Sequence, residues 1–407
     1  MTVPTPSVFP PSARPRLRAR ALGALVPFVL LLAACGSDDD PPPAAVASDA
    51  VQPAPEPPAG TLKQVAVLPR ADIDAAAAGR GWLDVTGPAR CDVAIHEIVH
   101  PTSGPSGQPT QVSGAVFVPS GAGCAGPHPL LSYSRGTDLE RTRALARPDD
   151  RESQAVMGFF AARGYLVVAS DYLGYAQSTF PYHPYLHAES VARTNIDALT
   201  AARRLLAAQG VSDDGRLFVT GYSQGGHAAL ATQRAIERDR PAGLTVVASG
   251  PMSGPYDLVG SFSDLALLLP LLANIGGSQA AQAVELRLGD VVGTGVEELL
   301  REQDTLREAL VVNTVIGWRP LAPMLLCGGA RDPIVPFSNT RNAAADFTAR
   351  GASVVVVDVD QEPAWQSRLP PPGASLSDLG SYHHGDVPPL CFAAVRDRLF
   401  DPVRGSP

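Results

Sequence analysis

The pentapeptide Gly221-Tyr222-Ser223-Gln224-Gly225 is the segment of this sequence best suited to chemistry. It matches the pattern G-x-S-x-G, in which a serine stands on a sharp turn between a strand and a helix and exposes its hydroxyl as a nucleophile. Glycines flank the serine because larger side chains would clash within the turn. The apolar run 217–220 precedes the motif and the Ala-rich run 226–238 follows it, as this turn requires. We therefore predict that Ser223 is a nucleophile.

A serine hydroxyl reacts only when a base accepts its proton, and the base is commonly a histidine oriented by a carboxylate. In proteins with this motif the acid and the histidine follow the serine along the chain. Asp332 comes directly after the apolar run 324–327, and we expect it to be the acid, with Asp360 as the alternative. Only His383 and His384 lie beyond Asp332, and spacing alone does not separate them.

Acyl transfer also requires two backbone N–H groups that stabilise a negatively charged oxygen. One is expected from Gln224, which follows the nucleophile at the start of a helix, where negative charge is favoured. The other is expected from the turn after the predicted strand 129–134, where Gly136 and Thr137 are both candidates.

Four further side chains are candidates for contact with a substrate. They lie next to the nucleophile, within the turn just described, or after the carboxyl end of the predicted strand 165–170, which is the ligand-binding edge of an open α/β sheet. These residues are Tyr222, Arg135, Tyr172 and His183. For the last two, packed and hydrogen-bonded loop residues are the alternative.

A second pattern, His96-Glu97-Ile98-Val99-His100, matches the zinc-binding motif H-E-x-x-H. That chemistry requires a helix, which places both histidines on one face. Here apolar residues alternate with others and Pro101 follows, which predicts a strand. On a strand the two histidines would lie roughly 13 Å apart, too far for one zinc ion. We expect no metal site.

From residue 61 onward, β-branched runs alternate with helical periodicity, which is typical of one α/β domain over 61–407. The expected strands are 91–100 and 111–119 as an antiparallel pair, then 129–134, 165–170, 216–220, 244–249, 323–326 and 353–359; the expected helices are 152–163, 188–209, 226–238 and 388–400. The apolar segment at about 255–320 is too long for a simple connection and predicts a helical cap over the site, with a core helix pair as the alternative.

The first 60 residues are expected to direct and tether the protein. Four arginines precede an apolar stretch of about a dozen residues, which is too short to span a membrane comfortably. It ends in Leu32-Ala33-Ala34-Cys35, which resembles the lipobox of bacterial lipoproteins. This implies a signal peptide over 1–35, lipidation of Cys35 and a lipid anchor in the cell envelope, with Gly36 favouring the outer membrane. An ordinary signal peptide is the alternative. The Pro-rich, acidic residues 36–60 predict a disordered tether.

The four remaining cysteines are an even number in a chain expected to be exported, which predicts two disulfides. Three pairings are possible, and we favour Cys91–Cys124 with Cys327–Cys391. The formal net charge is -8 and the mature region has no basic stripe, which argues against nucleic acid as a partner.

Several blocks together resemble the secretory lipase family of secreted bacterial α/β-hydrolases. The matching blocks are CDV (91–93), the Cys124-x-Gly-Pro block, YSRGT (133–137), DYLGY (171–175) with HPYLHAES (183–190), LFVTGYSQGGHAAL (217–230), APMLLCGGARDPIV (322–335) and YHHGDVPPLCFAAVRD (382–397). The resemblance implies the α/β-hydrolase fold, a mostly parallel sheet with helices on both faces, and esterase or lipase activity without a cofactor.

The same resemblance assigns roles to particular residues. It implies that Ser223 is the nucleophile and Asp332 the acid. It favours His383 as the base, because the histidine in such sequences follows a tyrosine and stands about eight residues before the cysteine. The chain departs from the family pattern at Arg135, where His is usual, and at His384, where Gly is usual. The predicted substrate is an ester or a lipid. A serine peptidase or acyltransferase with the same residues, and a non-catalytic surface-binding protein that retains the fold, are the alternatives.

Overall fold

The computed structural model describes residues 60–138, 140–260, 304–332, 334–368 and 376–405. Contacts divide the chain into two units, Met1–Pro55 and Glu56–Pro407, and every described residue belongs to the second. The expected signal peptide and nearly all of the tether lie outside the described residues, as does most of the expected cap at about 255–320. No helix of the described residues is long and apolar enough to cross a membrane.

The described strands form one nine-stranded sheet with the order β1-β2-β3-β5-β4-β6-β7-β8-β9. The strands are β1 (Thr61–Leu68), β2 (Asp92–Ser103), β3 (Pro109–Ser120), β4 (His128–Ser134), β5 (Leu166–Ser170), β6 (Asp213–Tyr222), β7 (Val246–Met252), β8 (Met324–Gly328) and β9 (Val354–Asp358). Pairing is antiparallel from β1 through β3 to β5 and parallel from β5 to β9. The predicted mostly parallel sheet is therefore confirmed.

The burial of the strands follows from their sequences. All residues of β4 and β5 are buried, as expected of continuous apolar runs that are covered on both faces. The expected pairing of β2 with β3 is confirmed over its whole length, from Asp92↔Ser120 to Ser103↔Pro109. His96 and His100 both lie on β2, a strand as predicted. The sequence did not predict β1, because most of its residues are exposed and its pairing with β2 is made by the backbone.

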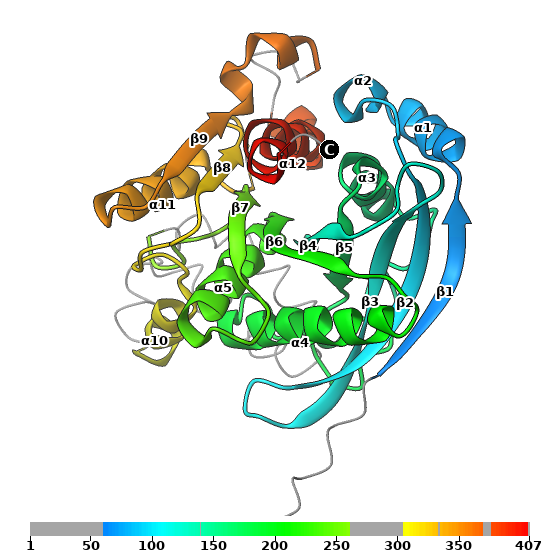
Figure 1. The fold of residues 1–407 in the computed structure, drawn as a ribbon. Coiled ribbons are helices and arrows are strands. Elements are labelled where there is room, and N and C mark those ends of the chain that lie inside the picture. The colour runs from blue at the N-terminus through cyan, green and yellow to red at the C-terminus, as the bar shows by residue number, and fades with distance from the viewer. Residues whose placement is uncertain (1–59, 139, 261–303, 333, 369–375, 406–407) are drawn as a thin grey trace, which may run out of the picture. The chain divides into compact units, whose positions relative to one another are not determined.

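Helices cover both faces of the sheet. They are α1 (Arg70–Gly79), α2 (Leu83–Thr86), α3 (Arg151–Phe159), α4 (Ala188–Ala207), α5 (Gln224–Asp239), α10 (Asp304–Asn313), α11 (Phe337–Ala349), α12 (Leu376–Val395) and α13 (Asp401–Arg404). Figure 1 shows α3 and α12 on one face and α4 and α5 on the other. Two core clusters match this arrangement, because one joins the sheet to α3 and α12 and the other joins it to α4 and α5.

The closing helix differs from the expectation. The predicted helix starts at Pro388. In the structure α12 begins at Leu376, continues through Pro388 and Pro389, and is followed by a π-helical turn to Phe400. The helix is thus long enough to carry the sequence before the prolines toward the site.

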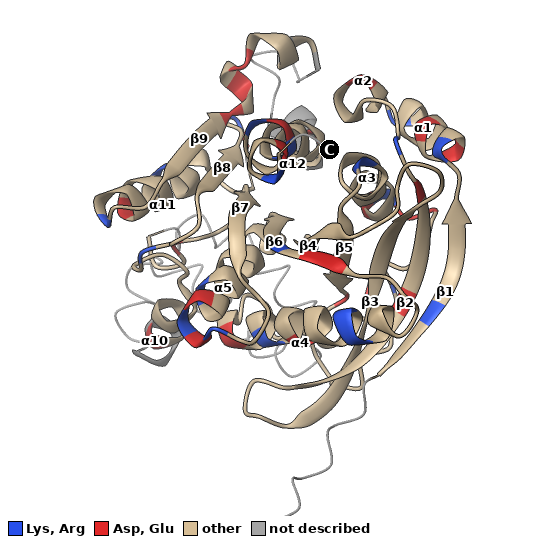
Figure 2. Cartoon of the chain, viewed as in Figure 1, with Lys and Arg blue, Asp and Glu red and all other residues tan. Residues whose placement is uncertain are grey.

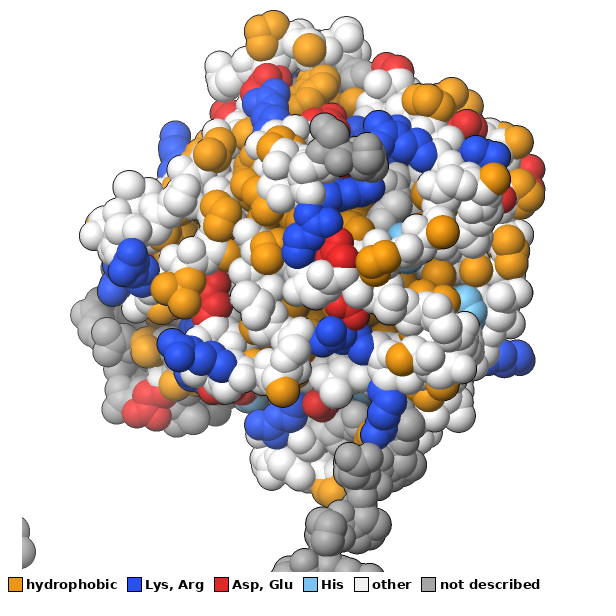
Figure 3. All heavy atoms as spheres, viewed as in Figure 1, with side chains coloured by type: hydrophobic (Ala, Val, Ile, Leu, Met, Phe, Trp, Pro, Cys, Tyr) orange, Lys and Arg blue, Asp and Glu red, His pale blue; other side chains and the backbone are white. Residues whose placement is uncertain are grey.

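Charged and apolar side chains are mixed on the surface. Figure 2 shows Lys and Arg interspersed with Asp and Glu along α1, α4 and α5. On the face drawn in Figure 3, hydrophobic side chains lie in small groups between charged and other atoms. Both favoured disulfides are confirmed: Cys91–Cys124 joins the residue before β2 to the segment after β3, and Cys327–Cys391 joins β8 to α12.

Candidate active site

Ser223 occupies the turn between β6 and α5. Its backbone has φ 59° and ψ −124°, an uncommon conformation for a residue with a side chain. Such a conformation costs on the order of 1–3 kcal/mol and persists only where the surrounding structure enforces it. The side chain is 9% exposed and lines a cavity. The predicted strand, sharp turn and helix are therefore all present.

The flanking glycines explain how the turn is accommodated. A Cβ atom on Gly225 would lie 2.0 Å from the carbonyl oxygen of Ser134, at the end of β4. A Cβ atom on Gly221 would lie 2.2 Å from the carbonyl oxygen of Gly225. Any other residue at Gly225 would force α5 away from β4, and any other residue at Gly221 would force β6 away from α5.

His384 connects Ser223 to Asp332. Its Nε2 lies 2.9 Å from Ser223 Oγ, and its Nδ1 lies 2.7 Å from Asp332 Oδ2. The partners indicate an Nδ1–H tautomer, so that Nδ1 donates to the carboxylate and Nε2 accepts from the serine. The structure thus corrects the preference for His383.

Asp332 is held by its own turn. Its side chain is fully buried, and its Oδ1 accepts hydrogen bonds from the N–H groups of Ile334 and Val335 at 2.9 and 3.0 Å. The other oxygen is left for His384. Asp360, the alternative acid, accepts from the N–H and the side chain of Arg331 instead, at 2.8 and 2.9 Å, and so fixes the turn that carries Asp332.

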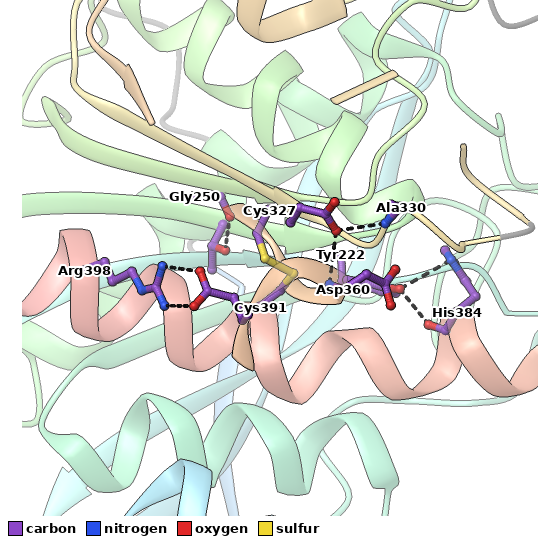
Figure 4. The surroundings of a disulfide bond; sticks show 11 residues. Tyr222, Gly250, Cys327, Ala330, Asp360, His384, Cys391 and Arg398 are labelled. Carbon is purple, nitrogen blue, oxygen red and sulfur yellow. Dashed lines mark hydrogen bonds and ion pairs between the residues drawn. A yellow bond between two sulfur atoms is a disulfide. The ribbon is translucent and has the colours of Figure 1, made fainter. Parts of the chain in front are cut away.

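Tyr222 contacts the same histidine. Its hydroxyl donates to the carbonyl oxygen of His384 at 2.6 Å and lies 3.3 Å from Nδ1, and the two rings are 5.0 Å apart between centroids. Figure 4 shows both interactions beside the Cys327–Cys391 disulfide. Tyr222 also lines the cavity, so its predicted place at the site agrees with the structure.

A cavity of about 480 Å³ opens beside Ser223 and His384. Its wall is largely apolar, with the side chains of Trp82, Ala155, Ile334, Pro388, Pro389 and Phe392. The polar groups on its wall include Thr137, Arg143, Arg151 and Glu152. This composition suits an uncharged substrate with an apolar part.

Glu152 limits the choice of oxyanion donors. Its Oε1 accepts from the N–H of Gly136 at 2.8 Å and from the hydroxyl of Tyr133 at 2.7 Å. The N–H of Gly136 is therefore engaged. Among the described residues, the N–H groups of Gln224 and Thr137 have no hydrogen-bond partner. The sequence did not point to Glu152, which stands at the start of α3 without a motif around it.

Arg135 is not a pocket residue, contrary to the prediction. It is fully buried, and its guanidinium lies 2.7 Å from Asp138 and 3.9 Å from Asp171, over the ring of Tyr175 at 5.0 Å. Burial raises the pKa of Asp171, and the positive charge of Arg135 opposes that shift. A buried guanidinium needs such partners, so its side chain turns into the protein and away from the cavity.

Tyr172 and His183 are also buried behind the site rather than in its wall. The hydroxyl of Tyr172 donates to the carbonyl of Arg135 at 3.0 Å, and its ring stacks on His183 at 5.7 Å. His183 Nδ1 contacts the carbonyl of Leu173 at 2.9 Å, and its Nε2 lies 2.6 Å from Nε2 of Gln224. Burial lowers the pKa of His183 to about 3, so the ring is neutral and accepts from Gln224. These two residues orient the turns on which the site stands.

No metal site is formed by the part of the chain that the structure describes, where no three His, Cys, Asp or Glu side chains are grouped to hold an ion.

Comparisons with known proteins agree with this fold. The model of the Secretory lipase family matches residues 152–241. A ligand-bound form of the rice cell wall degrading esterase LipA from Xanthomonas oryzae is 30% identical, with a TM-score of 0.71, over 84% of this chain and 98% of that one. A Legionella pneumophila protein assigned to the hydrolases is 22% identical, with a TM-score of 0.69, over 85% of this chain and 98% of that one.

Candida antarctica lipase A shares the fold at 17% identity and a TM-score of 0.51, over 73% of this chain and 76% of that one. No curated protein sequence matches. The fold, the family model and the Xanthomonas relative define an α/β-hydrolase that acts on esters. Within that class, the chain belongs to the secretory lipase family, with the Xanthomonas esterase among its relatives.

Proposed function

We propose that this protein is an exported serine hydrolase that cleaves carboxylic esters through an acyl-enzyme on Ser223. The observation that carries the proposal is the chain of hydrogen bonds from Ser223 Oγ to His384 Nε2 at 2.9 Å and from His384 Nδ1 to Asp332 Oδ2 at 2.7 Å. This arrangement removes the serine proton and stabilises the resulting imidazolium. Membership of a family of secreted ester hydrolases supports it.

The reaction proceeds in two steps. His384 accepts the proton of Ser223 as Oγ attacks the ester carbonyl, and the carbonyl oxygen becomes negative. The N–H groups of Gln224 and Thr137 are our candidates to stabilise it, because the N–H of Gly136 already donates to Glu152. The alcohol leaves with the proton from His384. Water then attacks the acyl-enzyme and gives a proton to His384, which returns it to Ser223 as the acid is released.

The cavity supports an ester with an apolar acyl or alcohol part. Its volume of about 480 Å³ and its aromatic and proline wall would enclose a short apolar chain beside Ser223. Esters in a plant cell wall are a second candidate, since the Xanthomonas relative degrades rice cell walls. A panel of p-nitrophenyl esters of increasing chain length would define the apolar limit, and release of acid from cell-wall material would test the second candidate.

Ser223→Ala tests the chemistry directly. We expect ester hydrolysis to fall by more than about 10⁴-fold, and labelling by a fluorophosphonate to disappear. Ser106→Ala changes an exposed serine of the β2–β3 turn and serves as the matched control. Retained hydrolysis in Ser223→Ala would refute the proposal. Absence of labelling in the folded wild type would favour a binding protein, and faster cleavage of aminoacyl amides than of esters would favour a peptidase.

We further propose that Cys35 is lipidated and that residues 36–60 tether the enzyme to the cell envelope. Radioactive palmitate should label the wild type but not Cys35→Ala, and the variant should move from the membrane fraction to the soluble fraction. Equal fractionation of the two proteins would favour an ordinary signal peptide.

A further inference from the structure

Two consecutive prolines stand inside α12, just after His384. In an α-helix the N–H of each residue donates to the carbonyl four residues earlier, and proline has no N–H. Pro388 therefore cannot donate to the carbonyl of His384, and Pro389 cannot donate to that of Gly385.

Side chains from other elements supply donors to both carbonyls. The hydroxyl of Tyr222, at the end of β6, donates to the carbonyl of His384 at 2.6 Å. A guanidinium N–H of Arg151, at the start of α3, donates to the carbonyl of Gly385 at 3.3 Å. The first bond is short and made by a side chain that is 7% exposed, whereas Arg151 is exposed. Tyr222 is therefore the stronger of the two anchors.

We propose that Pro388 and Tyr222 act together to position His384, a role that rests on the proposed function of the site. The proline frees a backbone carbonyl at the residue that carries the imidazole, and the tyrosine binds it. The same tyrosine ring packs against the imidazole at 5.0 Å and directly precedes Ser223 in the chain. One side chain thus ties the backbone of the base to the turn of the nucleophile.

Catalysis depends closely on the position of the imidazole. Its two nitrogens must stay within hydrogen-bond reach of Ser223 and Asp332 at once, and a displacement of about 1 Å can cost a hundredfold in rate. A residue with an N–H at position 388 would bond the His384 carbonyl within the helix, and Tyr222 would then compete for it. The proline leaves that carbonyl to Tyr222.

This reasoning predicts a specific rescue. In Tyr222→Phe the His384 carbonyl loses its donor, and we expect kcat to fall about tenfold or more while KM changes less than about twofold. Adding Pro388→Ala restores a backbone N–H to the same carbonyl, and kcat should recover at least about threefold. Adding Pro389→Ala restores an N–H to the carbonyl of Gly385 instead, and we expect no recovery. Each double variant replaces one proline of the cavity wall by alanine, so the two are matched in that change and differ in which carbonyl regains a helical donor.

Tyr165→Phe is the control for the loss of a buried tyrosine hydroxyl. Its hydroxyl donates to Asp401 at 2.7 Å, away from the cavity, so kcat should equal that of the wild type. Urea unfolding of every variant confirms that the comparison is made on folded protein. A Tyr222→Phe enzyme with wild-type kcat, or equal recovery with either proline substitution, would overturn the inference. Fluorophosphonate labelling of wild-type Ser223 in the same experiment shows whether the proposed function itself holds.

Discussion

The disulfide between Cys327 and Cys391 joins the strand that leads to Asp332 with the helix that carries His384. Cys327 lies in β8 and Cys391 in α12, and both side chains are fully buried (Figure 4). The acid and the base belong to segments far apart in the sequence. The disulfide makes a covalent link between their supporting elements.

We expect loss of this link to reduce catalysis as well as stability. In the double variant Cys327→Ala/Cys391→Ala the free energy of unfolding should fall by about 2–5 kcal/mol. The folded variant should also have a lower kcat, because α12 is then free to shift against β8. The double variant Cys91→Ala/Cys124→Ala is the matched control, since that disulfide does not reach the site. The bridged cysteines are 64 and 33 residues apart, so the loop-closure terms differ by only about 0.6 kcal/mol. Equal effects of both variants on kcat would contradict the prediction.

Glu152 holds the turn that is expected to stabilise the oxyanion. It accepts from the N–H of Gly136 and from Tyr133 within the cavity wall. In Glu152→Ala the turn loses this anchor, and we expect kcat to fall about tenfold with a smaller change in KM, since a small shift of the Thr137 N–H weakens the transition state. Glu140→Ala removes an exposed carboxylate of the following loop and should leave both constants unchanged. Wild-type kinetics in Glu152→Ala would show that Glu152 does not position the oxyanion donors.

Arg135 is expected to act through stability. Arg135→Met leaves the fully buried carboxylate of Asp171 without its nearby positive charge, and we expect a loss of about 3–5 kcal/mol in the free energy of unfolding. Arg147→Met is the control: its ion pair with Asp149 is exposed, 56% and 75% for the two side chains, and its loss should cost less than about 0.5 kcal/mol. Similar urea midpoints for the two variants would show that the buried pair contributes little.

Buried histidines should make the protein less stable in mild acid. Burial lowers the pKa of His183 to about 3 and those of His100 and His227 to about 4. As pH falls below the unfolded value of 6.5, the unfolded chain binds protons that the native protein does not. The free energy of unfolding should therefore fall by up to about 1.4 kcal/mol per pH unit for each such histidine, beginning near pH 6.5.

Urea unfolding between pH 7.5 and 5 measures this effect. His100→Asn removes one of the three groups at a place remote from the cavity, and an amide N–H stands in for the donor to the Pro101 carbonyl. The free energy of unfolding should then depend less steeply on pH, by an amount that corresponds to the uptake of about one proton on unfolding. A wild-type stability that stays flat to pH 5 would contradict the prediction.

The sequence by itself determined the features that depend on local chemistry. The turn at Ser223 follows from two glycines between a β-branched run and a helical run, because the steric requirement is met within five residues. The strand at His96–His100 follows from alternation and from Pro101. The eight expected strands were all found. Among them β4 and β5 are parallel and buried on both faces, and such strands have continuous apolar sequences.

Only the tertiary structure decided which long-range partners the polar side chains have. His383 and His384 are equivalent by spacing, and the orientation of α12 selected His384. The side chains that follow the ends of two central strands were predicted to contact a substrate, but three of them face the interior: Arg135, Tyr172 and His183. Because they are buried there, they must pair with buried carbonyls, carboxylates and polar side chains. Glu152 binds the turn at Gly136, and Tyr222 binds the carbonyl of His384. Neither contact is signalled by a sequence motif. Such contacts depend on how whole elements pack, and no short segment of sequence encodes that.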